Sequence, residues 1–412
     1  MRRAVITGIG PVTPTGTGKE AFWQGLQAGK SAVRPIVQFD VSSYRSQMAA
    51  MVTDFDPARY MDEKRCDRLD RFSQFAMAAA TLALDDAGLA VEDIPAERFG
   101  VALGTALGGV GLAEEQLRIF QERGLRAVNP LLALSVFCGA GSCNIAIALG
   151  AAGPVAANSN SCASGTIAFG DALSWIRNDL ADVVLAGGAE APLYPLCYGA
   201  FALIRAMSSR NDDPQTASRP FDRERDGFVM AEGAAMLVVE ELGHALDRGA
   251  TIYAEVAGYG LTNDAHHMTA PRPDGLHAAR AMSLALHDAR LGPGEIDHLS
   301  AHGSSTPLND KTETLAIKQV FGQRAYEIPI SAIKGHHGHA LGAAGAIEMA
   351  ASALALKHNY VPPTVNLEHA DPECDLDYVP REGRTCSLGA VLSNSFGFGG
   401  INACVVLRKA GA

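Results

Sequence analysis

An internal repeat constrains this chain more than any other feature. Leu82–Ile94 (LALDDAGLAVEDI) and Leu284–Ile296 (LALHDARLGPGEI) agree at seven of thirteen positions. Weaker similarities flank them in the same order, AVITGIG with AEVAGYG and GAAMLVVEE with GINACVVLR. A repeat of this kind indicates a duplicated unit, and 412 residues are too many for one simple core. The sequence therefore predicts two related halves, residues 1–250 and 251–412.

The repeated pieces have the patterns of helices and buried strands. FSQFAMAAATLALDDAG places Phe72 and Phe75 at helical spacing and stops at Gly88, a residue typical of helix ends. AAMLVV and ACVVL are short apolar runs that suit fully buried strands. Strands that alternate with helices predict an α/β fold with parallel-rich sheets covered by helices. The first half is longer, so we expect insertions within residues 105–145 and 190–230.

The net charge and the cysteines limit which binding partners and which cell compartment we expect for this protein. A net charge of −11 argues against nonspecific binding to nucleic acid or to an anionic membrane, because both require a cationic surface. Eight cysteines without CxxC pairs indicate reduced thiols in a cytoplasmic protein. The longest apolar stretch, residues 191–204, contains two prolines and is shorter than a spanning helix. We therefore expect no membrane segment, and MRRAVITGIG is typical of a first strand rather than a signal peptide.

One cysteine is distinguished by its position. In GPVAANSNSCASGTIAFG the residues before Cys162 favour a strand and a turn, and those after it favour a helix. Cys162 should therefore lie at a helix N-terminus, where free N–H groups and the helix dipole favour a thiolate and can hold an oxyanion. The alternative is a small buried hydrophobic residue, which is our interpretation of the other seven cysteines.

Two further strings place histidines and a lysine at the ends of predicted strands. In HLSAHGSSTPLND, His302 enters a hydroxyl-rich loop, where it serves either proton transfer or capping. In SAIKGHHGHALGAAGAIEM, Lys334 and His339 precede a helix at the place that corresponds to Cys162, so they should face the same cleft. Glu348 is the expected partner of a buried lysine. A metal site is the rival interpretation of the histidines, but the flexible glycines and the repelling lysine argue against it.

A third string, SNSFGFGGINACVV, places two phenylalanines among glycines. It is either a turn with core aromatics or a gate over a thiol. Dinucleotide binding is not indicated, because TGIGPVT has only the first two glycines of the fingerprint. One cysteine with two histidines fits acyl transfer through a thioester, whereas a cysteine protease would leave one histidine and Lys334 without a role.

Together these motifs resemble the β-ketoacyl-[acyl carrier protein] synthases of the thiolase superfamily, in the branch of elongating type II enzymes. The resemblance rests on SCASG, SRPFDRERDGF, HGSSTPLND, KGHHGHALGAAGA and NSFGFGG, which follow the family's order and span the chain. It implies an internally duplicated, five-layered αβαβα thiolase-like fold. It also implies decarboxylative condensation of a cysteine-bound acyl chain with malonyl-carrier.

The resemblance also implies roles for individual residues. Cys162 would be the nucleophile, and His302 and His339 would stabilise the enolate, with Lys334 and Glu348 as a supporting ion pair. The backbone N–H groups of Cys162 and Phe398 match the family's oxyanion hole. The positions implied to contact substrate are Ser304 and Thr306 on the pantetheine arm and Leu107, Phe396 and Phe398 around the acyl site. No metal or dissociable cofactor is implied, since phosphopantetheine arrives on the acyl carrier protein.

Substrate and assembly stay open at this point. RNDDPQTASRPFDRERDGF also resembles ketosynthase subunits of type II polyketide systems, so fatty acid elongation and polyketide or polyene assembly are both compatible. The dimer partner is either a second copy or a chain-length-factor-like subunit. The chain could itself be such a non-catalytic partner, or a biosynthetic thiolase. The small run at residues 139–142 predicts extra room for a long acyl chain, so Ala140→Phe should shorten the products.

An acidic carrier protein requires basic residues on an enzyme that is itself acidic. A solvated charged face is the alternative interpretation for any one of them. The candidates for the docking surface are Lys64, Arg65, Arg68, Arg71, Arg205 and Arg210.

Overall fold

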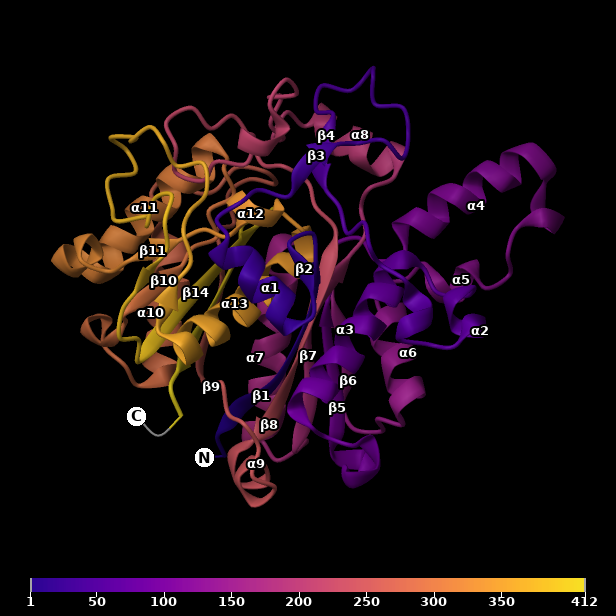
Figure 1. The fold of residues 1–412 in the computed structure, drawn as a ribbon, viewed down its shortest axis with the longest axis horizontal. Helices are drawn as coiled ribbons and strands as arrows, with labels where there is room; N and C mark the ends of the chain where they lie inside the picture. The colour runs from indigo at the N-terminus through magenta and orange to yellow at the C-terminus, as the bar shows by residue number, and fades with distance from the viewer. Residues whose placement is uncertain (1, 411–412) are drawn as a thin grey trace.

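A computed structural model describes residues 2–410, and each half of this chain contributes five strands to one large sheet (Figure 1). The strands of the first half are β1 (Ala4–Thr13), β5 (Phe99–Gly104), β6 (Val155–Asn158), β7 (Val183–Glu190) and β8 (Gly233–Glu241). Those of the second half are β9 (Ala254–Asn263), β10 (His298–Ser300), β11 (Ile330–Ser331), β14 (Ala390–Gly397) and β15 (Ile401–Arg408).

The two sets of strands have the same spatial order, β6-β5-β7-β8-β1 and β11-β10-β14-β15-β9. In each set the first three strands run parallel, and the fourth runs antiparallel to both of its neighbours. Residues 4–6 of β1 pair with residues 254–256 of β9, which joins the sets into one sheet. The predicted duplicated α/β fold is therefore confirmed. The division near residue 250 stays a prediction.

Helices form three layers around these strands. α3 (Arg71–Ala87) packs on β1 and β8, and α10 (Leu276–Ala289) packs on β9 and β15. α7 (Ser164–Arg177) and α13 (Ala344–His358) lie between the halves, because each contacts strands of both. Residues 344–356 of α13 are all buried, since their mostly small side chains let strands approach from both sides. The result is the predicted order of layers, αβαβα.

The remaining elements are mostly short and lie in the connections. Two small hairpins pair β3 with β4 and β12 with β13, and β2 pairs with the end of β1. These elements are β2 (Gly16–Thr17), α1 (Lys19–Gln27), β3 (Val33–Pro35), β4 (Met48–Ala50), α2 (Glu63–Cys66), α4 (Val110–Arg123), α5 (Leu132–Ser135), α6 (Ala140–Leu149), α8 (Pro195–Leu203), α9 (Leu242–Asp247), α11 (Pro307–Phe321), α12 (Lys334–His337), β12 (Tyr360–Val361) and β13 (Arg384–Thr385).

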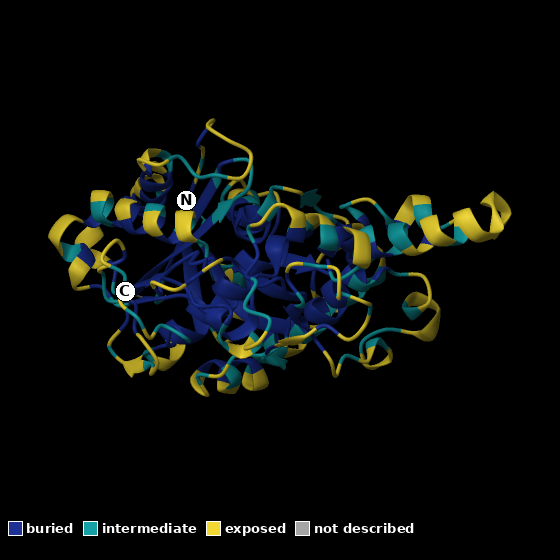
Figure 2. Cartoon of the chain, turned by 90° about the horizontal axis from the view of Figure 1, so that it is seen from above, coloured by how far each residue is buried: buried dark blue, intermediate teal, exposed yellow. Residues whose placement is uncertain are grey.

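The first half has much longer connections than the second. Residues 191–232 join β7 to β8, whereas residues 398–400 alone join β14 to β15. The connection after β5 includes α4, which projects from the body as a largely exposed arm (Figures 1 and 2). Sequence reasoning missed a further long connection, residues 14–70 between β1 and α3, because its elements are short and lack a long periodic pattern.

The small run at residues 139–142 does not create acyl space. Ala140 is buried in the core with Phe72, and a Cβ on Gly141 would lie 2.5 Å from Leu103 Cδ2. These residues let α6 approach α3 and β5 closely, so the expected extra room is contradicted.

No membrane segment is expected from the sequence. Within residues 2–410 no helix combines the length and apolarity needed to cross a bilayer.

Candidate active site

A cavity of about 350 Å³ opens between the two halves and has Cys162 on its wall. The second half contributes His302, His339, Phe396 and Phe398 to the same wall. These side chains come from four separate segments of the chain, so the repeated strand order brings together residues that lie up to 236 positions apart in sequence. The cleft predicted from the repeat is therefore present.

Cys162 lies in a single 3₁₀ turn, residues 161–163, directly before α7. Its expected place at a helix N-terminus is thus confirmed, but the expected thiolate is not. Only 7% of the residue is exposed, and burial raises the pKa of its thiol to about 11. Lys334 and a hydrogen bond from the Phe398 backbone lower this pKa, and they do not offset the burial. The resting group is a neutral thiol.

The end of β14 lies against the backbone of this turn. A Cβ on Gly397 would lie 3.2 Å from the backbone nitrogen of Cys162. Glycine at this position therefore leaves the N–H of Cys162 open toward the cavity.

Two neutral imidazoles face the thiol. The rings of His302 and His339 lie 5.3 Å apart at an interplanar angle of 80°. Burial and the neighbouring Lys334 hold both pKa values well below 6.5. Both rings are therefore uncharged at neutral pH.

Lys334 lies behind His302 rather than on the cavity wall, contrary to the expectation that it faces the cleft. Its Nζ donates to the carbonyl oxygen of His302 at 2.5 Å and lies 3.4 Å from Nδ1 of the same ring. It also forms the predicted buried ion pair with Glu348. Because an ammonium group only donates, Nδ1 must accept, and the ring proton is on Nε2.

A second buried carboxylate fixes the backbone at His302. Glu313 accepts the N–H groups of His302 and Gly303, each at 2.8 Å, and the side-chain amide of Asn394 at 3.1 Å. Burial raises the pKa of Glu313 to about 7, and these hydrogen bonds oppose the shift. The loop that carries His302 is therefore anchored to α11 and β14.

The mouth of the cavity combines hydroxyl groups with apolar side chains. Ser304 and Thr306 line it, with their hydroxyl oxygens 2.9 Å apart. Met268, in the connection between β9 and α10, is 72% exposed and accepts the N–H of Gly399 through its carbonyl at 2.7 Å. This hydrogen bond joins the Phe398 turn to the loop at the mouth.

Leu341 lines the cavity with Cys162 and belongs to the same buried apolar cluster. Leu107 is partly buried and packs against that cluster without lining the cavity. Leu341 has a φ of 44°, a left-handed conformation that is costly for a side chain of this kind.

The basic residues divide into exposed and structural groups. Lys64, Arg65, Arg68 and Arg205 are exposed, and Arg205 lies at the cavity mouth. Arg71 instead forms an ion pair with Glu232 and lies 4.6 Å from the ring of Phe75. The structure therefore removes Arg71 from the predicted docking surface.

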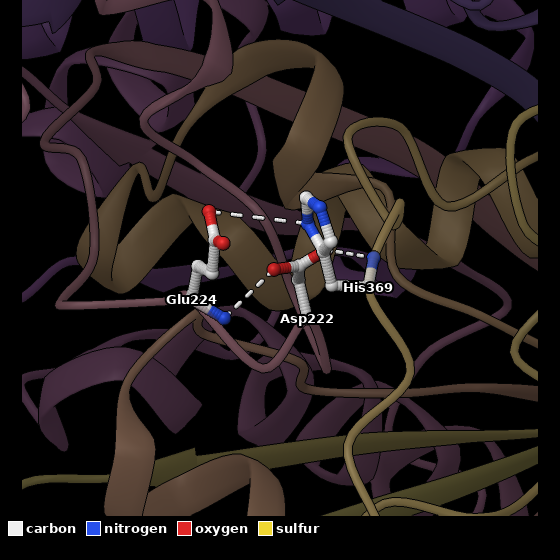
Figure 3. A group of neighbouring side chains, drawn as sticks. All are labelled: Asp222, Glu224 and His369. Atoms are coloured by element: carbon white, nitrogen blue, oxygen red, sulfur yellow. Dashed lines mark hydrogen bonds and ion pairs between the residues drawn. The ribbon is translucent and has the colours of Figure 1, made fainter.

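One group of side chains within residues 2–410 has a spacing compatible with a metal ion, namely Asp222, Glu224 and His369 (Figure 3). It is separate from the histidines that raised this possibility in the sequence. The Asp222 carboxylate accepts the backbone N–H groups of Glu224, Glu368 and His369 and pairs with Arg219 at 3.1 Å. Its oxygens are thus used to hold two loops together.

Sequence reasoning missed several residues of this site. Phe228 has its ring 5.5 Å from that of His339, and the loop at Met268 borders the mouth. The sequence does not mark Phe228 or Met268 as functional residues, because both have apolar side chains that only the fold brings to the cavity. Glu190 does have one, since it is a lone acidic residue at the end of the buried strand VVLAGGAE.

Two family models match this chain over most of its length, in the order seen in the fold. The N-terminal domain model of beta-ketoacyl synthase matches residues 1–245, and the C-terminal domain model matches residues 253–368. The chain belongs to the beta-ketoacyl synthase family. The thiolase-like resemblance inferred from the motifs is thereby confirmed.

Relatives within the beta-ketoacyl synthase family carry two kinds of name. The 3-oxoacyl-[acyl-carrier-protein] synthase 2 of Synechocystis sp. is 46% identical, covering 99% of this chain and 98% of that protein. A putative polyketide beta-ketoacyl synthase 1 of Streptomyces halstedii is 47% identical, covering 98% of both.

Solved structures agree closely with this fold. A type II polyketide acyl-carrier protein in complex with its ketosynthase matches with a TM-score of 0.93 at 40% identity, covering 99% of both chains. The ishigamide ketosynthase/chain length factor matches with a TM-score of 0.93 at 39% identity, covering 100% of both chains.

Proposed function

We propose that this protein is a β-ketoacyl-[acyl carrier protein] synthase that condenses an acyl chain on Cys162 with malonyl-carrier. The observation that supports this most directly is the cavity in which one thiol meets two uncharged imidazoles. Condensation requires a sulfur nucleophile, an oxyanion site and hydrogen-bond donors for an enolate, and each has a candidate here.

In the first half-reaction the sulfur of Cys162 attacks the acyl thioester of a carrier protein. The C–S bond to the carrier breaks, and the carrier thiol leaves with the proton that Cys162 loses. The N–H groups of Cys162 and Phe398 would hold the oxyanion of the intermediate. The equivalent N–H of the second half, at Gly342, donates to a carboxylate oxygen of Glu190 at 3.0 Å, which supports the ability of a turn of this kind to bind a negative oxygen.

In the second half-reaction malonyl-carrier loses carbon dioxide, and the electron pair of the broken C–C bond forms an enolate. His302 would donate from Nε2, because Lys334 occupies Nδ1. His339 would be the second donor. The enolate carbon then attacks the acyl-Cys162 carbonyl and the C–S bond breaks. The sulfur leaves as a thiolate that takes a proton from water, and β-ketoacyl-carrier is released. Neutral imidazoles suit this role since they donate a hydrogen bond without protonating the carbanion.

The remaining assignments concern substrate contacts. Ser304 and Thr306 at the mouth would bind the pantetheine arm, and Leu107, Phe396 and Phe398 would border the acyl chain. We propose no resident cofactor or metal, because pantetheine arrives with the carrier. The relatives named above support both fatty acid and polyketide settings, and the partner subunit is a second copy or a chain-length-factor-like protein.

Carrier docking would use Lys64, Arg65, Arg68 and Arg205, which are all exposed, and Arg205 also lines the cavity. Arg205→Glu should weaken carrier binding most at low salt. If this variant binds the carrier like wild type at every salt concentration, these residues are not the docking surface.

A cytoplasmic location stays a prediction, supported by eight free thiols within the described residues.

Two other functions fit the residues of this cavity less well. A non-catalytic partner subunit would not need the thiol and both imidazoles, and this chain retains all three. A biosynthetic thiolase would use a second cysteine as base, where the NSFGFGG turn has phenylalanine.

The test is condensation by the purified protein with acyl- and malonyl-loaded bacterial acyl carrier protein, followed by mass spectrometry of the carrier. We expect a β-ketoacyl product and an acyl adduct on Cys162. Cys162→Ala should abolish both, whereas Cys143→Ala, at an exposed thiol, should not. Condensation that survives in Cys162→Ala would favour the non-catalytic subunit, and condensation of acetyl-coenzyme A alone would favour the thiolase.

A further inference from the structure

Glu190, the last residue of β7, is fully buried and has no place in the proposed reaction. Among residues 2–410 it forms no ion pair. Instead it accepts four hydrogen bonds: from the hydroxyl of Thr105 at 3.1 Å and from the backbone N–H groups of Ala106, Leu107 and Gly342 at 2.6, 3.2 and 3.0 Å. One carboxylate therefore holds two segments that are far apart in the sequence.

Each of these segments carries a leucine that belongs to or packs against the apolar cluster of the nucleophile. The N–H of Leu107 is itself one of the donors, and Leu341 directly precedes the donor Gly342. Leu341 is a buried member of the cluster that contains Cys162, and Leu107 packs against it. Leu341 is held at a positive φ, a conformation that persists only where the surroundings enforce it. The hydrogen bond to Gly342 is part of that enforcement.

The chemistry of the donors favours a carboxylate at this place. Burial raises the pKa of Glu190 to about 7, and the surrounding N–H donors lower it. A side-chain amide has one acceptor oxygen, and its NH₂ group would face N–H groups that also donate. The charge also acts on the nucleophile, since Glu190 raises the pKa of Cys162.

We propose that Glu190 is a positioning residue that fixes Leu341 on the cavity wall and Leu107 behind it, and thereby sets which acyl chain lengths the thiol accepts. This inference rests on the proposed function, because it assumes that Cys162 carries the acyl chain. It goes further by assigning chain-length selection to a carboxylate that does not touch the substrate. The four donors to Glu190 fix both leucines at their backbone, so loss of the carboxylate frees both together.

The test compares acylation of Cys162 by acetyl-, octanoyl- and dodecanoyl-loaded carrier protein, followed by intact mass, in wild type and Glu190→Gln. The ratio of kcat/KM between the best and the worst chain should fall about tenfold in Glu190→Gln, mainly through a higher KM for the best chain. Decarboxylation of malonyl-carrier should change less than twofold, because it needs no acyl chain in the pocket. A general folding defect would lower both activities.

Two further variants keep the test decisive. Thr105→Val removes one of the four donors and should shift the ratio in the same direction by about threefold, even if Glu190→Gln does not fold. Glu240→Gln is the matched control, since Glu240 is a buried carboxylate bound to Thr7 and Arg248, far from the cavity wall. It should keep the wild-type ratio. An unchanged ratio in Glu190→Gln or in Thr105→Val overturns the inference, whereas a wild-type protein that accepts no acyl chain would overturn the proposed function instead.

Discussion

The turns that precede α7 and α13 have the same backbone but different chemistry. Each is a 3₁₀ turn of three residues, 161–163 and 341–343, and each begins with a residue at positive φ, 51° at Ser161 and 44° at Leu341. Cys162 in the first turn corresponds to Gly342 in the second. The duplicated fold thus supplies two equivalent N–H groups at helix starts, and side chains decide their use.

The strand ends that face these turns make the difference. Gly397, at the end of β14, has no side chain and leaves the N–H of Cys162 open. Glu190, at the equivalent end of β7, occupies the N–H of Gly342 with its carboxylate. One turn is therefore free for chemistry, and the other is closed by the protein itself. The second half supplies the imidazoles and the buried cation instead.

The largest effect should come from removing that cation. Lys334→Met leaves the fully buried Glu348 without its partner, so the free energy of unfolding should fall by about 3–5 kcal/mol in urea denaturation. The double variant Lys334→Met/Glu348→Gln should recover most of this loss. Lys318→Met, which breaks a partly exposed pair with Asp375, should cost less than about 1 kcal/mol. Equal losses in the two single variants would show that Lys334 is not buried as described.

The next prediction separates the two halves by their chemistry. His302→Ala and His339→Ala should each lower carbon dioxide release from malonyl-carrier by about 100- to 1000-fold, because each removes one donor to the enolate. Acylation of Cys162 should stay within about tenfold of wild type, since the first half supplies the nucleophile and the helix start. The measurements are labelled carbon dioxide release and intact mass. Equal losses in both steps would contradict this division.

A smaller effect is expected when the open turn is partly closed. Gly397→Ala places a methyl group about 3.2 Å from the Cys162 nitrogen, so acylation should slow by roughly 10- to 100-fold as the oxyanion loses access to that N–H. Gly294→Ala, where a Cβ has no neighbour within 4 Å, is the control and should leave the rate unchanged. A wild-type rate in Gly397→Ala would remove this N–H from the mechanism.

The last prediction needs no substitution and concerns the pH dependence of the resting thiol. Because burial raises the pKa of Cys162 to about 11, its thiolate fraction should rise about tenfold per pH unit between pH 7 and 10. Iodoacetamide labelling of the Cys162 peptide should rise in parallel without a plateau, whereas an unperturbed cysteine in a short blocked peptide levels off above its pKa of about 8.5. A plateau below pH 9 would mean that the helix start outweighs burial.

The sequence predicts the repeat, the place of Cys162 before a helix and the pairing of Lys334 with Glu348, because each depends on local pattern or on the duplication. It does not predict the protonation of the thiol, since the burial of Cys162 comes from residues distant in the chain. Glu190 could be noticed as an acid at the end of an apolar strand. Its bond to Gly342 spans 152 positions and could not be inferred without the fold.

The placement of β1 has a consequence for biosynthesis. All ten of its residues are buried, yet both of its main neighbours, β8 and β9, are translated more than 200 residues later. At roughly 5–20 residues per second, the nascent strand waits on the order of tens of seconds before its hydrogen bonds can form. Until then an apolar segment at the start of the chain is exposed and can aggregate. We therefore expect the yield of folded protein to depend on the supply of ribosome-associated chaperones.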